Sequence, residues 1–220
     1  MLSGPFRGIR YGRKAVGSVL AAKIFGTYEM ELWPIWNEII KTKPSSILDV
    51  GAAEGYYAVG FSVRIRNCKV IAFEQTAQGR EQIKNNARKN RCLTNMKILG
   101  KCTAKSLKEA VFRYAPEFMI MDVEGAEKNL LSGPNIKYLN KTNVIVELHP
   151  WINKNIKTYL WREFKKTHQL SLIHTKSRSY FDIPKTSPLD WVFARWWKEL
   201  VDERRPEPME WLILRPFKKI

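Results

Sequence analysis

Five side chains that can bind ligands or carry protons stand at or just past the ends of apolar runs: Asp49, Glu74, Asp122, Glu147 and His149. If those runs are parallel strands of an open sheet, ligands bind at their carboxyl ends and the five groups meet at one edge. A carboxylate or an imidazole there can take the proton of an attacking hydroxyl, and carboxylate oxygens can hold Mg²⁺. The spacing therefore predicts one site that combines ligand binding with proton or metal chemistry.

Three of these residues, Asp122, Glu147 and His149, are the candidates for catalysis. An ordinary histidine has a pKa of about 6.5, so His149 can act as a base near neutral pH. Asp122 and Glu147 are also the candidate ligands of a divalent cation such as Mg²⁺, which lowers the pKa of a bound hydroxyl. The neighbouring acids have a structural alternative: Glu124 can accept backbone hydrogen bonds in its turn, and Glu127 can stabilise the start of a helix.

The segment 46–56, Ser-Ile-Leu-Asp-Val-Gly-Ala-Ala-Glu-Gly-Tyr, has the pattern of a buried strand that enters a glycine-containing turn and then a helix. Gly51 and Gly55 let the backbone turn tightly and approach a bound ligand. Glu74 stands nineteen residues after Gly55, at the end of the next apolar run. An acid at this spacing is the usual partner of ribose hydroxyls, so the turn and Glu74 predict a site for an adenosine-containing ligand.

The charge of the turn indicates which adenosine ligand it suits. A dinucleotide-binding loop reads G-x-G-x-x-G and faces a pyrophosphate, whereas this turn has Ala53 at the middle position and acids at Asp49 and Glu54. Acids attract a cationic ligand and repel a diphosphate. S-adenosylmethionine carries a sulfonium and an ammonium group and no phosphate. We therefore expect it as the cofactor, with Asp49 and Gly51 beside its methionine part.

Residues 49–55, Asp-Val-Gly-Ala-Ala-Glu-Gly, resemble the first motif of class I S-adenosylmethionine-dependent methyltransferases. Residues 122–127, Asp-Val-Glu-Gly-Ala-Glu, resemble the signature of the FkbM-type branch, and two leucines and Gly133 follow as in that group. Residues 144–149 resemble its fifth strand, and the likeness spans roughly residues 27–175. It implies methylation of a hydroxyl on a small molecule or a sugar.

The resemblance also implies an entry segment and leaves one contact open. Residues 26–29, Gly-Thr-Tyr-Glu, resemble a segment that often lies near the cofactor in this group, which makes Tyr28 or Glu29 a candidate to close over the sulfonium. The alternative for Thr27 is a helix cap. Many methyltransferases place an acid against the adenine amine after the third strand. This chain has Gly-Lys-Cys at 100–102, so the adenine contact must come from the backbone or from another residue.

Apolar runs alternate with helical patterns along the chain, which is typical of a parallel sheet covered by helices on both faces. We expect strands over 46–50, 69–74, 95–99, 117–122, 143–148, 169–175 and 210–215. We expect helices from 126 onward and over 33–41, 55–65, 78–90, 104–113 and 154–167. The predicted fold class is α/β, a Rossmann-like methyltransferase fold with a seven-stranded, mostly parallel sheet. The resemblance implies that the last strand is antiparallel and lies beside the fifth.

A single domain accounts for 220 residues. We divide it into an N-terminal arm and helix over 1–42, of which 1–26 is expected to form a loosely held arm or a short helix, and a methyltransferase domain over 43–220 with an insertion at about 176–208. Within the insertion, apolar residues recur at helical spacing over 189–200, which predicts a tryptophan-rich amphipathic helix. This helix packs on the sheet edge, or it is a lid, a dimer contact or a membrane-surface helix.

The formal net charge is +17. Such a charge makes an anionic partner such as nucleic acid possible and keeps an RNA methyltransferase open as an alternative function. A solvated, lysine-rich surface explains the charge equally well. The other alternative is a noncatalytic module on the same fold that binds a partner or a membrane. The composition predicts no oligomeric state.

Three cysteines, Cys68, Cys92 and Cys102, are too few for a disulfide framework and lack metal-ligand spacing, so we expect thiols in a reducing compartment. No apolar stretch approaches the length that spans a bilayer. The basic N-terminus precedes an apolar stretch over 15–25 that Lys23 interrupts, whereas a cleavable signal has a cleaner apolar core. We therefore expect a cytoplasmic protein, with a transit peptide as the alternative.

Overall fold

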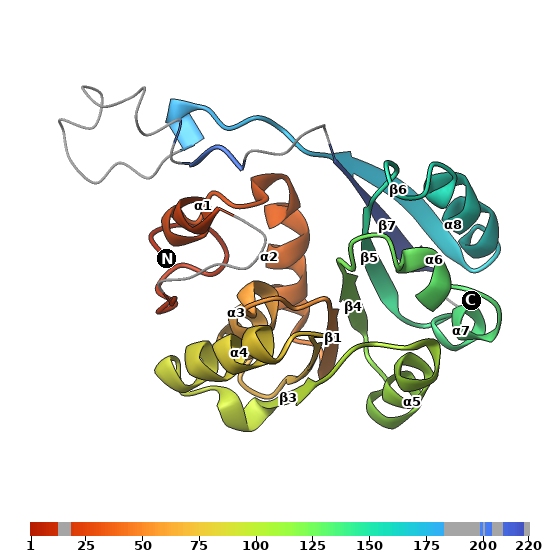
Figure 1. Cartoon of the computed structure of the whole chain (residues 1–220), viewed down its shortest axis with the longest axis horizontal. Helices are drawn as coiled ribbons and strands as arrows, with labels where there is room; N and C mark the ends of the chain where they lie inside the picture. The colour runs from red at the N-terminus through yellow and green to blue at the C-terminus, as the bar shows by residue number, and fades with distance from the viewer. Residues whose placement is uncertain (13–18, 183–198, 200, 204–208, 218–220) are drawn as a thin grey trace.

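The sheet has seven strands in the order β3-β2-β1-β4-β5-β7-β6 (Figure 1). The computed structural model describes residues 1–12, 19–182, 199, 201–203 and 209–217. The strands are β1 Ser46–Val50, β2 Lys69–Phe73, β3 Met96–Leu99, β4 Phe118–Met121, β5 Asn143–Leu148, β6 His168–His174 and β7 Glu210–Pro216. Neighbouring strands are parallel except that β7 runs antiparallel to both β5 and β6. The predicted fold class is confirmed, including the antiparallel last strand beside the fifth.

Helices cover both faces of this sheet. They are α1 Leu20–Phe25, α2 Trp33–Thr42, α3 Tyr56–Arg64, α4 Ala77–Lys89, α5 Ala104–Tyr114, α6 Glu127–Leu130, α7 Pro134–Tyr138 and α8 Ile156–Phe164, with single 3-10 turns at Met30–Leu32, Leu93–Asn95 and Tyr180–Asp182. Figure 1 shows α1 to α4 on one side and α5 to α8 on the other. Successive residues of a strand point to opposite faces, so Ile47 packs with α2 to α4 and Leu48 with α5 to α8.

The main difference in element boundaries lies after β4. The helix expected from 126 onward is two short helices, α6 and α7, and Gly133 lies between them with a φ of +54°. A positive φ cannot continue a right-handed helix, so the chain turns at this glycine and starts again. The acidic segment 122–127 is therefore followed by little more than one helical turn before the next bend.

Residues 1–26 contain a short helix, α1, which is one of the two predicted alternatives, and the described part of this region is packed rather than loosely held. Phe6 is 1% exposed and its ring meets the edges of Tyr56 and Phe61 at centroid distances of 5.4 and 5.1 Å. Gly60 makes room for it, since a Cβ there would lie 2.7 Å from the Phe6 ring. Residues on both sides of the predicted boundary at 43 therefore share one core.

The described parts of the predicted insertion also contact this N-terminal region. Arg178 is buried and pairs with Glu31 at 2.7 Å and with Glu203 at 2.5 Å. Its Nε also donates to the carbonyl of Thr27 at 2.9 Å. These bonds join the segment after β6 to the chain before α2. Apart from Glu199, the predicted helix over 189–200 lies outside the described residues.

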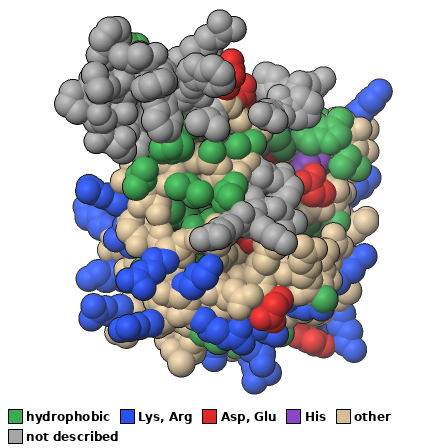
Figure 2. All heavy atoms as spheres, turned by 60° about the vertical axis from the view of Figure 1, so that its left-hand side comes forward, with side chains coloured by type: hydrophobic (Ala, Val, Ile, Leu, Met, Phe, Trp, Pro, Cys, Tyr) green, Lys and Arg blue, Asp and Glu red, His purple; other side chains and the backbone are tan. Residues whose placement is uncertain are grey.

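On one face of the molecule, positively charged side chains extend over a broad area. Figure 2 shows Lys and Arg side chains over the lower part of one face, and hydrophobic side chains together above them. A spread of this kind identifies no single partner, so nucleic-acid binding stays a prediction. Among the described residues, no helix combines the length and the apolar character that crossing a membrane would require.

Candidate active site

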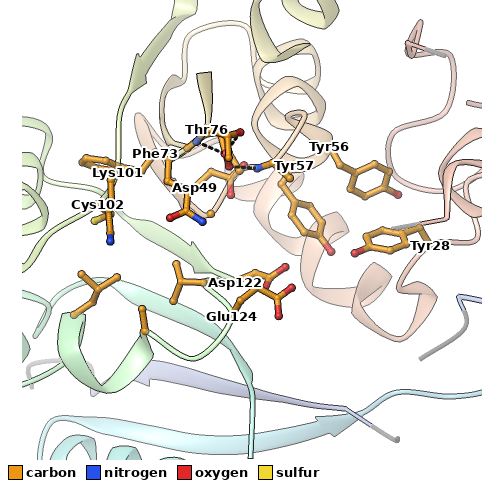
Figure 3. A pocket seen from close by; sticks show the side chains of 18 of the residues that line it. Tyr28, Asp49, Tyr56, Tyr57, Phe73, Thr76, Lys101, Cys102, Asp122 and Glu124 are labelled. Atoms are coloured by element: carbon orange, nitrogen blue, oxygen red, sulfur yellow. Dashed lines mark hydrogen bonds between the residues drawn. The ribbon is translucent and has the colours of Figure 1, made fainter. Parts of the chain in front are cut away.

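A cavity of about 320 Å³ lies at the carboxyl ends of β1, β2 and β4. Figure 3 shows Asp122 and Glu124 facing the ends of β1 and β2 across it, with Tyr28 and Tyr56 at one end and Lys101 at the other. The predicted site residues that line this cavity are Tyr28, Asp49, Gly51, Ala53, Glu74 and Asp122. The predicted residues Glu29, Gly55, Glu147 and His149 are not among the described residues that line it. Most of the predicted site residues therefore lie together at one edge of the sheet, as expected.

The turn after β1 joins the ends of three strands. The backbone N–H groups of Gly51 and Ala52 both donate to the carbonyl of Phe73 on β2, at 3.0 and 2.9 Å. Gly51 has a φ of +89°, and a Cβ at this position would lie 1.6 Å from the carbonyl oxygen of Asp122 on the β4 side. The absence of a side chain at Gly51 thus lets the β1 turn lie directly against the backbone that carries Asp122.

Glu74 is held in a fixed orientation at the end of β2. Its Oε2 accepts from the backbone of Ala53 at 3.0 Å, and its Oε1 accepts from the backbone and the hydroxyl of Thr76, both at 2.7 Å. A Cβ at Gly79, in the first turn of α4, would lie 2.6 Å from Cγ of Glu74. The glycine therefore makes room for the buried carboxylate, a signal in the sequence that the prediction did not use.

Asp49 lies at the end of β1 with 3% of its surface exposed, and its Oδ2 has no hydrogen-bond partner among the described residues. Burial raises the pKa of Asp49 to about 7, and the nearby acids Glu74 and Glu54 act in the same direction. Lys23 and the backbone N–H of Ala58 act against this rise in pKa. An unpaired carboxylate oxygen in a cavity is suited to a cationic ligand.

His149 lies beneath the loop after β4 and is 1% exposed. Its Nδ1 is 2.5 Å from Oε1 of Glu127, and its Nε2 is 3.6 Å from Asp122 and 3.4 Å from Glu124. Burial alone lowers the pKa of a histidine, but here the hydrogen bond to Glu127 and the surrounding acids outweigh it, so the pKa of His149 is raised. The imidazole thus joins a buried acid to two acids of the cavity wall.

Glu147 and Glu29 lie outside this arrangement. Glu147 is buried on β5, where its partner across the ladder is Trp211, and its charge contributes to the raised pKa of His149. Glu29 is fully buried before the 3-10 turn, and its backbone N–H donates to Glu203 at 3.0 Å. Neither position contradicts the predicted roles, which stay predictions.

Sequence reasoning missed several residues of the cavity wall and its support. Lys23 lines the cavity from α1, and its interruption of an apolar stretch was the available signal. Tyr56 and Tyr57 line it from the start of α3. Glu127 was assigned to the start of a helix, but its carboxylate also accepts from Gly125 at 3.0 Å and orients His149. No local pattern indicates the pairing of Glu127 with His149, the residue that follows β5.

The far end of the cavity is lined by Phe73, Lys101 and Cys102, at the position where the resemblance left the adenine contact open. Burial raises the pKa of the Cys102 thiol to about 12, so the thiol stays neutral at physiological pH. These three side chains provide an aromatic ring, a neutral sulfur and a cation.

No protein-family model and no curated protein matches the chain. Solved structures share its fold. The O-methyltransferase TomG of tomaymycin synthesis from Streptomyces achromogenes, in complex with S-adenosylmethionine, has a TM-score of 0.56 and 9% identity, with 92% of this chain and 83% of that chain covered. The O-methyltransferase from Bacillus cereus in complex with S-adenosylhomocysteine has a TM-score of 0.54 and 9% identity, with 96% and 84% covered.

A precorrin methyltransferase from Geobacter metallireducens has a TM-score of 0.52 and 10% identity, with 94% of both chains covered. At these identities the likeness establishes the Rossmann-like methyltransferase fold. Because O-methyltransferases and a precorrin methyltransferase share it, the fold does not define the acceptor.

Proposed function

We propose that the chain is an S-adenosylmethionine-dependent methyltransferase that methylates a hydroxyl of a small molecule or a sugar. The observation that carries the proposal is the placement of acids in the cavity: Asp49 and Glu74 at the strand ends, with Asp122 and Glu124 facing them. This arrangement favours a cationic nucleoside over a diphosphate, which argues against a nicotinamide dinucleotide. The fold shared with solved methyltransferases supports the proposal.

The residues of the cavity fit the parts of this cofactor. Oε2 of Glu74 accepts one hydrogen bond, from Ala53, so it can accept another from a ribose hydroxyl. Oδ2 of Asp49 can accept from the ammonium group of the methionine part. When bound, the cofactor supplies a methyl group that is already activated, so the protein's main contribution is to hold the acceptor in line with it.

Asp122 and Glu124 are the cavity residues placed to take the proton of an acceptor hydroxyl. His149 lies behind them, and its Nε2 is within 3.6 Å of both carboxylates. Glu127 fixes the imidazole through Nδ1, so a neutral His149 presents Nε2 as an acceptor toward Asp122. We assign Asp122 the contact with the acceptor and His149 the next position for the proton. Glu147 contributes through its charge on His149.

Three finer assignments rest on the sequence. The segment 122–127 supports the FkbM-type branch, and three free cysteines support a cytoplasmic location. The charge of +17 keeps an RNA acceptor as the alternative to a sugar or small molecule.

The experiment that tests the proposed function separates binding from transfer. We expect saturable binding of S-adenosylhomocysteine to the wild type by calorimetry and no binding of NAD. Asp122→Asn should keep this affinity within about threefold but lower methyl transfer to hydroxyl acceptors by about 100-fold, because it removes a proton acceptor. Transfer is measured with a labelled methyl group over a panel of sugars and small hydroxyl compounds. Binding of NAD instead, or of neither ligand, would contradict the proposal.

The proposal includes a divalent cation, but its proposed ligands differ from those predicted from the sequence. The sequence paired Asp122 with Glu147, but the described residues whose ligand atoms lie within 4.8 Å of one another are Asp122, Glu124 and His149. The contact between His149 and Glu127 matches the way second-shell carboxylates orient metal-binding histidines.

His149→Gln is expected to weaken Mn²⁺ or Mg²⁺ binding at least tenfold, since it removes a ligand. His168→Gln is the matched control, because His168 is also a buried, hydrogen-bonded histidine but lies outside the cluster. The affinity should rise with pH, because a metal displaces the proton that the raised pKa of His149 retains. Isothermal titration measures all three affinities. Equal effects of the two variants would contradict this ligand set.

A further inference from the structure

Lys23 reaches the cavity from outside the sheet. It belongs to α1, in the N-terminal region, and its side chain is only 4% exposed although it carries a charge. It lines the same cavity as Asp49, Glu74 and Asp122. A buried ammonium group on a cavity wall needs an explanation, because removing such a charge from water costs several kcal/mol unless the charge is compensated.

The compensation that the structure provides is incomplete. Nζ of Lys23 is 2.5 Å from Oε1 of Glu54, which is its one hydrogen-bond acceptor among the described residues. It lies over the rings of Tyr28 and Tyr56, at 4.6 and 5.4 Å from their centroids. Rings attract a cation but do not replace a hydrogen-bond acceptor, and an ammonium group has three N–H donors. The hydroxyl of Tyr11 donates to the same oxygen of Glu54 at 2.5 Å.

Lys23 and Asp49 present opposite charges to the same cavity. The charge of Lys23 lowers the pKa of Asp49, so the two groups interact, and Oδ2 of Asp49 has no hydrogen-bond partner among the described residues. Figure 3 shows Tyr28 and Tyr56, the two rings beneath the ammonium group, at the end away from Lys101 and Cys102. A cation and an anion placed together are complementary to the two charges of an α-amino acid.

We propose that Lys23 binds the carboxylate of the amino-acid end of the cofactor, while Asp49 receives its ammonium group. The inference rests on the proposed function, since it assigns one end of that cofactor. It makes α1 part of the binding site. It also explains why an apolar stretch is interrupted by a lysine whose side chain is directed inward. Lys23 therefore selects nucleosides that carry an amino-acid tail.

The competing explanation is that Lys23 only neutralises Glu54. Removing one partner of a buried ion pair leaves an uncompensated charge and can unfold the chain, whereas replacing both partners by neutral groups avoids this. The test therefore uses the double variant Lys23→Met with Glu54→Gln, and Glu54→Gln alone as its control. A cooperative thermal unfolding transition is required of each variant, as the check that it is folded.

The experiment compares two ligands, S-adenosylhomocysteine and its decarboxylated form, which keeps the ammonium group and lacks only the carboxylate. The wild type and Glu54→Gln should bind the intact ligand more tightly than the decarboxylated one by roughly tenfold or more, as expected for a hydrogen bond to a charged group. In the double variant the two ligands should bind within about threefold of each other. Any indirect effect of Lys23 through Asp49 acts on both ligands and cancels in their ratio.

The outcomes are distinguishable. If the ratio of the two affinities is unchanged in the folded double variant, Lys23 does not bind the carboxylate and the inference is wrong, while the proposed function stands. If the wild type does not discriminate between the ligands, the inference is wrong as well. If neither ligand binds to the wild type, the proposed function and the inference both fail.

Discussion

Gly51→Ala is expected to lower the free energy of unfolding by about 3–5 kcal/mol and to abolish measurable binding of S-adenosylhomocysteine. The added Cβ would lie 1.6 Å from the carbonyl oxygen of Asp122, and the residue has a φ of +89°. Relief requires the β1 turn and the loop after β4 to separate. That separation displaces the backbone between Asp49 and Asp122 and opens the cavity. Thermal unfolding should show a loss of roughly 10 °C in Tm.

Two glycines of the same chain separate the causes of this effect. Gly8 has a φ of +85° and no atom within 4 Å of an added Cβ, so Gly8→Ala reports the backbone strain alone, about 1–2 kcal/mol. Gly100 has neither strain nor a contact, so Gly100→Ala should change stability by less than about 0.5 kcal/mol. If Gly51→Ala were no worse than Gly8→Ala, close packing against Asp122 would not be the reason for glycine at this position.

The sheet and most of the cavity were predictable because they depend on local patterns. β1 and β4 are buried at every residue, so β4 is apolar throughout and β1 is apolar except for Ser46 and Asp49. Once these runs are taken as parallel strands, the rule that ligands bind at strand ends places Asp49, Glu74 and Asp122 together. The placement of these three residues required only the positions of the strands along the chain and the types of the side chains at their ends.

The contacts that the sequence did not reveal join segments far apart in the chain. Glu127 and His149 are 22 residues apart, and they meet only because β4 and β5 are neighbours in the sheet. Phe6 and Lys23 reach the α3 side from an arm without periodic apolar residues. Pairing of this kind depends on tertiary packing, which the sequence patterns of helices and strands do not reveal. The grouping of Glu124 with Asp122 and His149, whose side-chain ligand atoms lie within 4.8 Å of one another, was missed for the same reason.

Asp49 should make both folding and cofactor binding depend on pH. Its pKa in the folded chain is about 7, against an ordinary value of 3.8, chiefly because it is buried. The folded state therefore prefers the protonated acid. The stability that this preference contributes is fully present below about pH 4 and is lost as the pH rises through about 7. Asp49→Asn should remove this loss, so the variant without ligand is expected to be more stable than the wild type at pH 8, by at most about 4 kcal/mol.

Binding should show the opposite trend. A cationic ligand favours the ionised form of Asp49, so the affinity of the wild type for S-adenosylhomocysteine should rise between about pH 5.5 and 7.5, with release of a proton on binding. Asp49→Asn should bind more weakly at pH 7.5 and lose most of this pH dependence. Calorimetry in buffers with different ionisation enthalpies counts the protons released. An unchanged proton count in Asp49→Asn would show that another group, such as His149, is responsible, and would remove the link between the buried acid of β1 and the charge of the ligand.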